Sequence, residues 1–233
     1  MDTNKVLLMI LDGWGKSINP KASAIENANT PFIDSLYTKF PNANLKTDGQ
    51  EVGLPKGQMG NSEVGHLNLG AGRIVYQNLT RINMSIENGE LESNKTITEA
   101  FKFAEKNKKN IHLLGLISSG GVHSHFNHLL ELIKISENFK SNVFIHGSTD
   151  GRDVDPKSAI NDLKILEEYI SNKKCKIASI IGRYYSMDRD CRWERTKLAY
   201  NLICKGEGRK VVDFISEIKT SYKNECTDEF LKP

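Results

Sequence analysis

The amino-acid sequence predicts an α/β fold class, with mostly parallel sheets flanked by helices. In the second half of the chain, short apolar stretches typical of buried strands alternate with amphipathic stretches typical of helices. Such alternation indicates βαβ units, in which the strands run parallel. Dense polar sequence also follows the ends of several expected strands, and parallel sheets bind their ligands at those ends.

The expected elements follow in chain order. The expected strands comprise residues 5–11, 111–117, 143–146 and 176–182. The expected helices comprise residues 30–40, 96–107, 125–136, 155–170 and 190–204. Thr30 before Pro31, the capping-box pattern at residues 96–99, and Asp155 before Pro156 predict where some of these helices begin.

The composition is typical of a soluble globular protein. Of the 233 residues, 38% are hydrophobic and 26% are charged, and the net charge is +3. This weak charge favours neither a nucleic acid nor a membrane surface as a partner, and the longest apolar run, residues 6–11, is too short to span a bilayer. The acidic start of the chain does not favour a secretory signal, so we expect a cytoplasmic protein.

The cysteines are widely and irregularly spaced in the second half of the chain, at Cys175, Cys191, Cys204 and Cys226. They include no CxxC pair, which argues against a zinc ribbon or a thioredoxin-like redox site. We therefore expect reduced thiols.

Ser62 lies in a glycine-rich stretch, residues 47–72, with little apolar periodicity, which suggests backbone in close approach to another group. A serine where such a turn opens a helix lies near backbone N–H groups that bind phosphate and favour an oxyanion. Asn61 can donate a hydrogen bond to the same phosphoryl group. The alternative is an ordinary N-cap serine, with Glu63 complementing the helix dipole.

Asp12 follows the first expected strand, at a glycine turn. A carboxylate there can bind a divalent metal, which prefers hard oxygen ligands. The alternative is a turn aspartate that bonds to its own backbone. Because no Ser-His-Asp arrangement is legible in the sequence, metal activation of Ser62 is favoured over activation by a base.

Three histidines follow the strand at residues 111–117, at His123, His125 and His128. Their spacing presents no obvious trio on one helix face, and no HExxH pattern or nearby cysteine supports zinc. We expect one or two of them to be structural. His123 is nearest the strand end and is the candidate for substrate contact or proton transfer.

Three arginines follow two other strands, at Arg152, Arg183 and Arg189. Guanidinium groups that converge at one sheet edge suit a small phosphorylated carboxylic acid, because each can bind carboxylate or phosphate bidentately. Asp153 adds an acceptor for a substrate hydroxyl. The later Arg192 and Arg195 are interpreted as structural residues on a helix.

An ordered set of motifs resembles the cofactor-independent (2,3-bisphosphoglycerate-independent) phosphoglycerate mutases. The matching segments are residues 10–15, 57–72, 120–125, 150–153 and 181–190. Each motif alone is weak, but their order and separations cover almost the whole chain and are highly specific. A phosphopentomutase is a related alternative, and the motif at residues 181–190 argues against it.

The resemblance implies an enzyme of the alkaline-phosphatase superfamily with an inserted transferase-like domain. Residues 1–76 would be the first, incomplete segment of a phosphatase-like metal and nucleophile domain. Residues 77–233 would be a transferase-like substrate-binding domain, truncated at its C-terminus. The enzyme would interconvert 3-phosphoglycerate and 2-phosphoglycerate in glycolysis and gluconeogenesis through a phosphoserine intermediate.

The resemblance also implies roles for particular residues. Ser62 would take the phosphoryl group, and Asp12 with Ser62 would ligate one of two manganese ions, with no organic cofactor. The positions that match the family's substrate-phosphate site are His123, Arg152, Asp153, Arg183 and Arg189.

Family members are about twice as long as this chain, so the resemblance implies that the remaining metal ligands and part of the substrate site lie outside it. Three explanations fit: a truncated gene product, an expressed fragment, or half of a split enzyme whose partner is a separate C-terminal half. We therefore expect the chain to be inactive alone. A non-catalytic phosphoglycerate-binding fragment is the alternative function.

Overall fold

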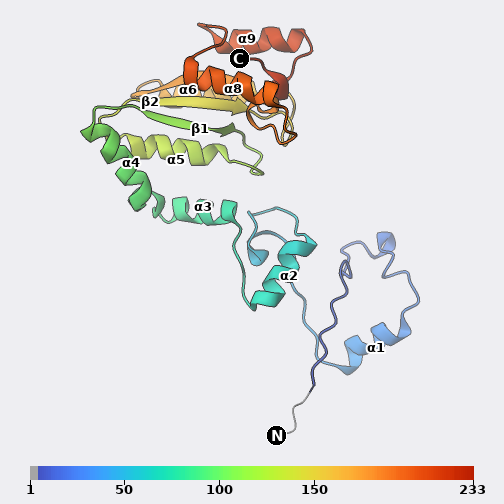
Figure 1. Cartoon of the computed structure of the whole chain (residues 1–233). Helices are drawn as coiled ribbons and strands as arrows, with labels where there is room; N and C mark the ends of the chain where they lie inside the picture. Colours follow the sequence, from blue (N-terminus) through green and yellow to red (C-terminus); the bar gives the residue numbers. More distant parts are fainter. Residues whose placement is uncertain (1–4) are drawn as a thin grey trace. The chain divides into compact units, whose positions relative to one another are not determined.

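The computed structural model describes residues 5–233, and the chain divides into two compact units. The first unit extends to Thr80, and the second comprises Arg81–Pro233. In the first unit, short helices are joined by long irregular segments (Figure 1). Its α-helices are α1 (Pro31–Lys39) and α2 (Ser62–Ala71), its 3₁₀ helices are η1 (Pro20–Ala22) and η2 (Gly49–Val52), and α3 (Asn78–Glu87) spans the boundary.

The second unit contains the sheet and most of the helices. Its strands are β1 (Ile111–Ile117), β2 (Val143–Thr149) and β3 (Cys175–Gly182). Its helices are η3 (Leu91–Ser93), α4 (Lys95–Lys106), α5 (Phe126–Ser136), α6 (Ala159–Ile170), α7 (Arg183–Ser186), α8 (Trp193–Lys205), α9 (Phe214–Lys223) and η4 (Asp228–Phe230). Among the residues that the structure describes, no helix is both long and apolar enough to cross a membrane.

The parallel sheet confirms the predicted α/β class. The strands lie in the order β1-β2-β3, and both neighbouring pairs are parallel. The register pairs Ile117 with Thr149 and Thr149 with Gly182, so all three strands end at the same edge. The loops that follow these strand ends therefore start side by side, and they carry the candidate substrate residues.

The core of the second unit joins the helices to the sheet. Ile133 of α5 and Leu163 and Leu166 of α6 are fully buried, and they belong to one apolar cluster with Val143 and Ile145 of β2. Leu163 and Leu166 are three residues apart and so lie on one helix face, while Val143 and Ile145 share one face of their strand. This spacing explains why the amphipathic stretches fold against the sheet.

The prediction of a strand at residues 5–11 is wrong. This segment is irregular and exposed, with Val6 and Leu7 retaining 89% and 83% of their accessible surface. An apolar run indicates a tendency to be buried, but a strand also needs a neighbouring strand to pair its backbone groups. No segment within residues 5–233 pairs with this one, so the run forms no strand.

Some predicted helix starts are displaced. Asn94 caps α4 in place of the expected box at residues 96–99, because its Oδ1 accepts a hydrogen bond from the Ile97 amide at 3.2 Å. Asp155 accepts a hydrogen bond from the Lys157 amide at 2.9 Å and so forms a local turn before α6 begins. Helix α8 likewise begins at Trp193, later than the expected residue 190.

The glycine-rich stretch also contains more regular structure than its composition indicated. Helix α2 occupies its second half, and the predicted close backbone approaches involve the chain itself. A Cβ on Gly60 would lie 1.7 Å from the Thr47 carbonyl oxygen, and one on Gly53 would lie 2.2 Å from that of Val75. Any side chain at Gly53 or Gly60 would push these backbone segments apart.

Replacing Leu163 by alanine should destabilise the second unit by about 2–5 kcal/mol, because the side chain is fully buried and would leave a cavity. Urea unfolding followed by circular dichroism measures the loss. Ile165→Ala on the same helix is the matched control, since Ile165 is 52% exposed. Equal losses in the two variants would contradict the assigned core.

Candidate functional site

Arg183 is the centre of a polar cluster at the carboxyl edge of the sheet. It begins α7 directly after β3, and its side chain is only 8% exposed. Its Nη1 donates hydrogen bonds to Asp150 Oδ1 and Asp153 Oδ2, each at 2.6 Å. Both carboxylates lie in the loop that follows β2. One guanidinium group thus ties together the ends of two neighbouring strands.

Asp150 is buried and fully engaged by this network. Its Oδ2 accepts a hydrogen bond from Ser118 Oγ at 2.6 Å, and its Oδ1 accepts from the amides of Arg152 and Asp153 at 3.1 and 3.0 Å. Burial alone raises the pKa of Asp150, but the bonds from Asp153, Ser118, Arg183 and Arg152 outweigh it and hold that pKa below its ordinary value. Asp150 therefore stays ionised at neutral pH.

The same balance acts on the arginine. Burial lowers the pKa of Arg183, but its bonds to Asp153 and Asp150 outweigh burial and raise that pKa overall. The pair is therefore a lasting ionic contact between the loops after β2 and β3.

His123 and Arg152 form the accessible rim of the cluster. His123 Nε2 lies 3.8 Å from Asp153 Oδ2, and the His123 side chain is 45% exposed. Arg152 is also exposed, and its Nη1 lies 3.4 Å from Glu229 Oε1. Four of the five expected substrate residues are thus joined directly or through Asp150.

Arg189 does not join this cluster. It is exposed, and within residues 5–233 it makes no ion pair and no side-chain hydrogen bond. Arg195, interpreted from the sequence as structural, contacts Asp188 at 3.1 Å and lies over the Tyr184 ring at 3.8 Å. These contacts support its structural role.

A second polar cluster, in the first unit, surrounds Ser62. Ser62 is the first residue of α2, and its Oγ donates a hydrogen bond to Asp12 Oδ2 at 2.7 Å. Asn61 is the N-cap, because its Oδ1 accepts a hydrogen bond from the Val64 amide at 2.9 Å. The alternative that Ser62 caps the helix is therefore wrong, and its hydroxyl is directed at Asp12.

His66 is a neighbour of Ser62 that sequence reasoning did not assign. Its Nδ1 lies 2.8 Å from the Ser62 carbonyl oxygen and 3.2 Å from Ser62 Oγ. The four-residue spacing on a helix was the available signal, since such residues share a face. The arrangement is not a Ser-His-Asp relay, because Asp12 and His66 both contact the serine directly.

The oxygen pair of Asp12 and Ser62 suits a hard divalent cation, which prefers such ligands. Within residues 5–233, however, no group of three or more His, Cys, Asp or Glu side chains is arranged to hold a metal ion. These two residues could therefore supply only part of a metal site.

Two of the three clustered histidines have structural contacts, as expected. His125 is the N-cap of α5 and its Nδ1 accepts a hydrogen bond from the Asn127 amide at 3.2 Å. His128 Nε2 lies 2.6 Å from Asn83 Oδ1, and burial lowers the pKa of His128. Only His123 remains for a role at the sheet edge.

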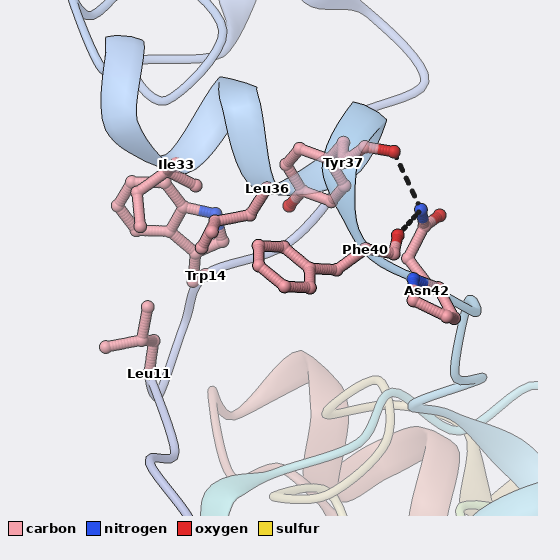
Figure 2. A pocket seen from close by; sticks show the side chains of 8 residues that line it. Leu11, Trp14, Ile33, Leu36, Tyr37, Phe40 and Asn42 are labelled. Carbon is pink, nitrogen blue, oxygen red and sulfur yellow. Dashed lines mark hydrogen bonds between the residues drawn. The ribbon is translucent and has the colours of Figure 1, made fainter.

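An apolar hollow of about 260 Å³ lies in the first unit between the segment around Trp14 and helix α1 (Figure 2). Its lining carries no charged side chain, and Asn42 donates its amide hydrogens to the carbonyl oxygens of Tyr37 and Phe40. A phosphorylated acid would find no counter-charge there. The hollow is therefore a poor candidate for the site.

Comparison with known proteins assigns a family to this architecture. The family profile described as BPG-independent PGAM N-terminus matches residues 82–233. The chain belongs to this family.

Individual relatives agree with the assignment. The chain is 60% identical over 230 residues to the 2,3-bisphosphoglycerate-independent phosphoglycerate mutase of Flavobacterium psychrophilum, covering 98% of this chain and 46% of the relative. It is 49% identical over 232 residues to the protein of the same name from Bacteroides fragilis, covering 99% and 46%. The chain thus spans about half the length of the curated relatives it matches.

A solved structure supports the fold. The chain resembles the phosphoglycerate mutase of Leishmania mexicana, crystallised at low cobalt concentration, with a TM-score of 0.70 and 30% identity. The match covers 89% of this chain and 40% of the other.

The structure adds functional candidates that sequence reasoning missed. Ser118 and Asp150 hold Arg183 and the loop after β2, and Glu229 contacts Arg152. Asp150 lies in the motif at residues 150–153, but its ion pair with Arg183 joins the loops after two different strands. No spacing within the sequence indicates such a contact.

Replacing Asp150 by asparagine should destabilise the second unit by about 3 kcal/mol at neutral pH, because it breaks a buried ion pair. The pKa of Asp150 is depressed, so its contribution is present above its ordinary value of 3.8 and is lost as pH falls through the folded-state pKa. Urea unfolding of both proteins across pH should show the difference shrinking below about pH 4.

Asp190→Asn is the control for this variant, since Asp190 is exposed and should change stability little. A difference between wild type and Asp150→Asn that persists unchanged at the lowest pH would contradict the ionic role of Asp150.

Proposed function

We propose that this chain supplies the nucleophile and a substrate pocket of a phosphoglycerate mutase, which interconverts 3-phosphoglycerate and 2-phosphoglycerate through phosphorylated Ser62. The observation that carries the proposal is the cluster around Arg183, in which basic groups from neighbouring strand ends converge at one edge. The names of the relatives support the choice of substrate. The pathway would then be glycolysis and gluconeogenesis.

The proposed pocket suits the charges of phosphoglycerate. The substrate carries a phosphate and a carboxylate, and a guanidinium group can bind either bidentately. Arg152 is exposed and can turn toward a ligand, whereas Arg183 uses only its Nη1 for Asp150 and Asp153. Asp153 would accept a hydrogen bond from the substrate hydroxyl, and His123 would contact the phosphate. Arg189 would add a further cation from the exposed segment before α8.

Ser62 would act as the nucleophile of the second cluster. Its Oγ would form a bond to phosphorus while the bond from phosphorus to the glycerate oxygen breaks. Asp12 Oδ2 would accept the serine proton, and the departing glycerate oxygen would take a proton from water. The N-terminus of α2 favours the negative charge of the phosphoryl group, and the Asn61 amide can donate a hydrogen bond to it. The glycerate would then re-orient, and its other hydroxyl would take the phosphoryl group back. That hydroxyl would lose its proton to solvent, and Ser62 would recover its proton from Asp12.

Asp12 and Ser62 would provide oxygen ligands to one of two manganese ions, with the remaining ligands supplied from outside this chain. Bound metal would offset phosphoryl charge and lower the pKa of the serine hydroxyl. Asp12 holds the serine hydroxyl in place in either case, since they are 2.7 Å apart. No organic cofactor enters this reaction, and we propose that it takes place in the cytoplasm.

The partner for activity would be a C-terminal half, because the chain spans about half of its relatives. A phosphoglycerate-binding fragment without catalysis is the second candidate. It is favoured by the contrast between the well-connected arginine cluster and the Asp12–Ser62 pair, beside which residues 5–233 present no group of three or more His, Cys, Asp or Glu side chains arranged to hold a metal ion.

Replacing Arg183 by lysine should weaken binding of 3-phosphoglycerate about tenfold or more, because the charge remains but the planar fork is lost. Calorimetric titration of the purified chain measures the affinity. Arg209→Lys is the matched control, since Arg209 is 70% exposed and pairs with Glu217 on the surface. Unchanged affinity in Arg183→Lys would remove this arginine from the pocket.

Mixing the chain with a separately produced C-terminal half of the Flavobacterium psychrophilum relative should yield interconversion of the two phosphoglycerates in the presence of manganese. An unactivated serine hydroxyl is a weak nucleophile, so the chain alone should show none. Ser62→Ala should abolish the reconstituted activity, whereas Ser35→Ala on α1 should retain it. A coupled enolase assay follows the product.

Turnover by the 233-residue chain alone would overturn the need for a partner. Binding of 3-phosphoglycerate without activity in the mixture would favour the non-catalytic alternative.

A further inference from the structure

The segment 228–231, which we name the strap, lies across the carboxyl ends of β2 and β3. The Thr149 hydroxyl at the end of β2 donates a hydrogen bond to the Asp228 carbonyl oxygen at 2.7 Å. The Gly182 amide at the end of β3 donates to the Leu231 carbonyl oxygen at 2.7 Å. The strap is thus fastened to both strand ends that precede the candidate arginines.

Asp228 is fully buried and makes several further contacts of the strap. Its amide donates a hydrogen bond to the Pro156 carbonyl oxygen at 3.0 Å, and its Oδ2 accepts one from the Ala159 amide at 2.8 Å. The Tyr222 hydroxyl donates to its Oδ1. Ser158, the N-cap residue of α6, makes no side-chain cap bond, so Asp228 caps this helix from a distant part of the chain.

These contacts hold both ends of the loop at residues 150–158 in place. The loop leaves β2 next to Thr149 and enters α6 at Ala159, and Asp228 bonds to both residues. Arg152 and Asp153 lie within the loop, as does Asp150, which holds Arg183. The strap therefore contacts the one segment on which most of the candidate pocket depends.

The loop fits against the strap with no spare room. Gly151 has a φ of +70°, and a Cβ there would lie 2.8 Å from Asp228 Cβ and 2.9 Å from the Glu229 amide nitrogen. A Cβ on Gly182 would lie 2.3 Å from the Glu229 carbonyl oxygen. Gly151 precedes Arg152 and Gly182 precedes Arg183. A displacement of the strap would therefore change the space available to the backbone next to each arginine.

We propose that Asp228 is a positioning residue for the arginine pocket, which it holds in place through the loop at residues 150–158. Among the described residues, Asp228 makes no hydrogen bond or ion pair with Arg152 or Arg183. It therefore acts through that loop and through Glu229, which contacts Arg152. The choice of ligand rests on the proposed function, but the positioning of the loop does not. A buried carboxylate destabilises a fold unless its hydrogen bonds are satisfied, and Asp228 receives them from Tyr222 and Ala159.

The test is Asp228→Asn, which keeps the side-chain shape but leaves one acceptor oxygen for two donors, Tyr222 and Ala159. Amide hydrogen exchange at Arg152 and Asp153, whose N–H groups bond to Asp150, should become at least about tenfold faster. The dissociation constant for 3-phosphoglycerate should rise about tenfold, the size expected for one lost bond to a charged group.

Two further variants separate positioning from general stability. Gly151→Ala should also speed up amide exchange in the loop and weaken ligand binding. Its Cβ would lie too close to Asp228 Cβ and would push the loop and the strap apart. Ile133→Val, in the core helix α5, should lower the melting temperature without changing the exchange of the two loop amides or the affinity.

Unchanged loop exchange in Asp228→Asn would overturn the proposal, as would an equal effect in Ile133→Val. Faster loop exchange in a chain whose wild-type form does not bind 3-phosphoglycerate would support the positioning role and contradict the proposed function. Amide exchange therefore tests the positioning role of Asp228, whereas binding of 3-phosphoglycerate tests the proposed function.

Discussion

The ion pair between Arg183 and Asp150 is the interaction on which the candidate pocket depends. Each charge is buried, and removing an ion from water destabilises a fold by several kcal/mol unless hydrogen bonds compensate. Here Ser118 and two loop amides complete the shell of Asp150, and Asp153 adds a second partner for Arg183. The buried groups are satisfied together, so losing one member would leave each of its neighbours with one hydrogen bond fewer.

This network also determines which basic side chains remain accessible. Arg183 is largely neutralised by Asp150 and Asp153, whereas Arg152 and His123 stay exposed at the rim. An incoming anion would thus meet exposed groups first and a buried, hydrogen-bonded arginine behind them. Because Arg183 is already held in place at the bottom of the pocket, less conformational entropy is lost on binding. The exposed rim allows the ligand to enter.

The two units differ in how they are stabilised. The second has a sheet whose strands all pair and a core with fully buried side chains such as Leu163 and Ile145. The first has short helices and a small buried cluster of Val52, Leu54 and Val64, and it exposes apolar side chains at residues 6–11. Unpaired apolar surface of this kind marks a site where another segment can pack. The second unit is therefore the better packed of the two.

The sequence by itself determined the α/β class, the strand at residues 111–117 and the grouping of polar residues after the strands, because these follow from periodicity within short windows. It also placed the nucleophile candidate Ser62 at the start of a helix. Only the tertiary structure decided that residues 5–11 form no strand, that Asp150 pairs with Arg183, and that Asp228 caps a helix far away in the chain. Each of these depends on a partner distant in sequence, and local pattern carries no information about such partners.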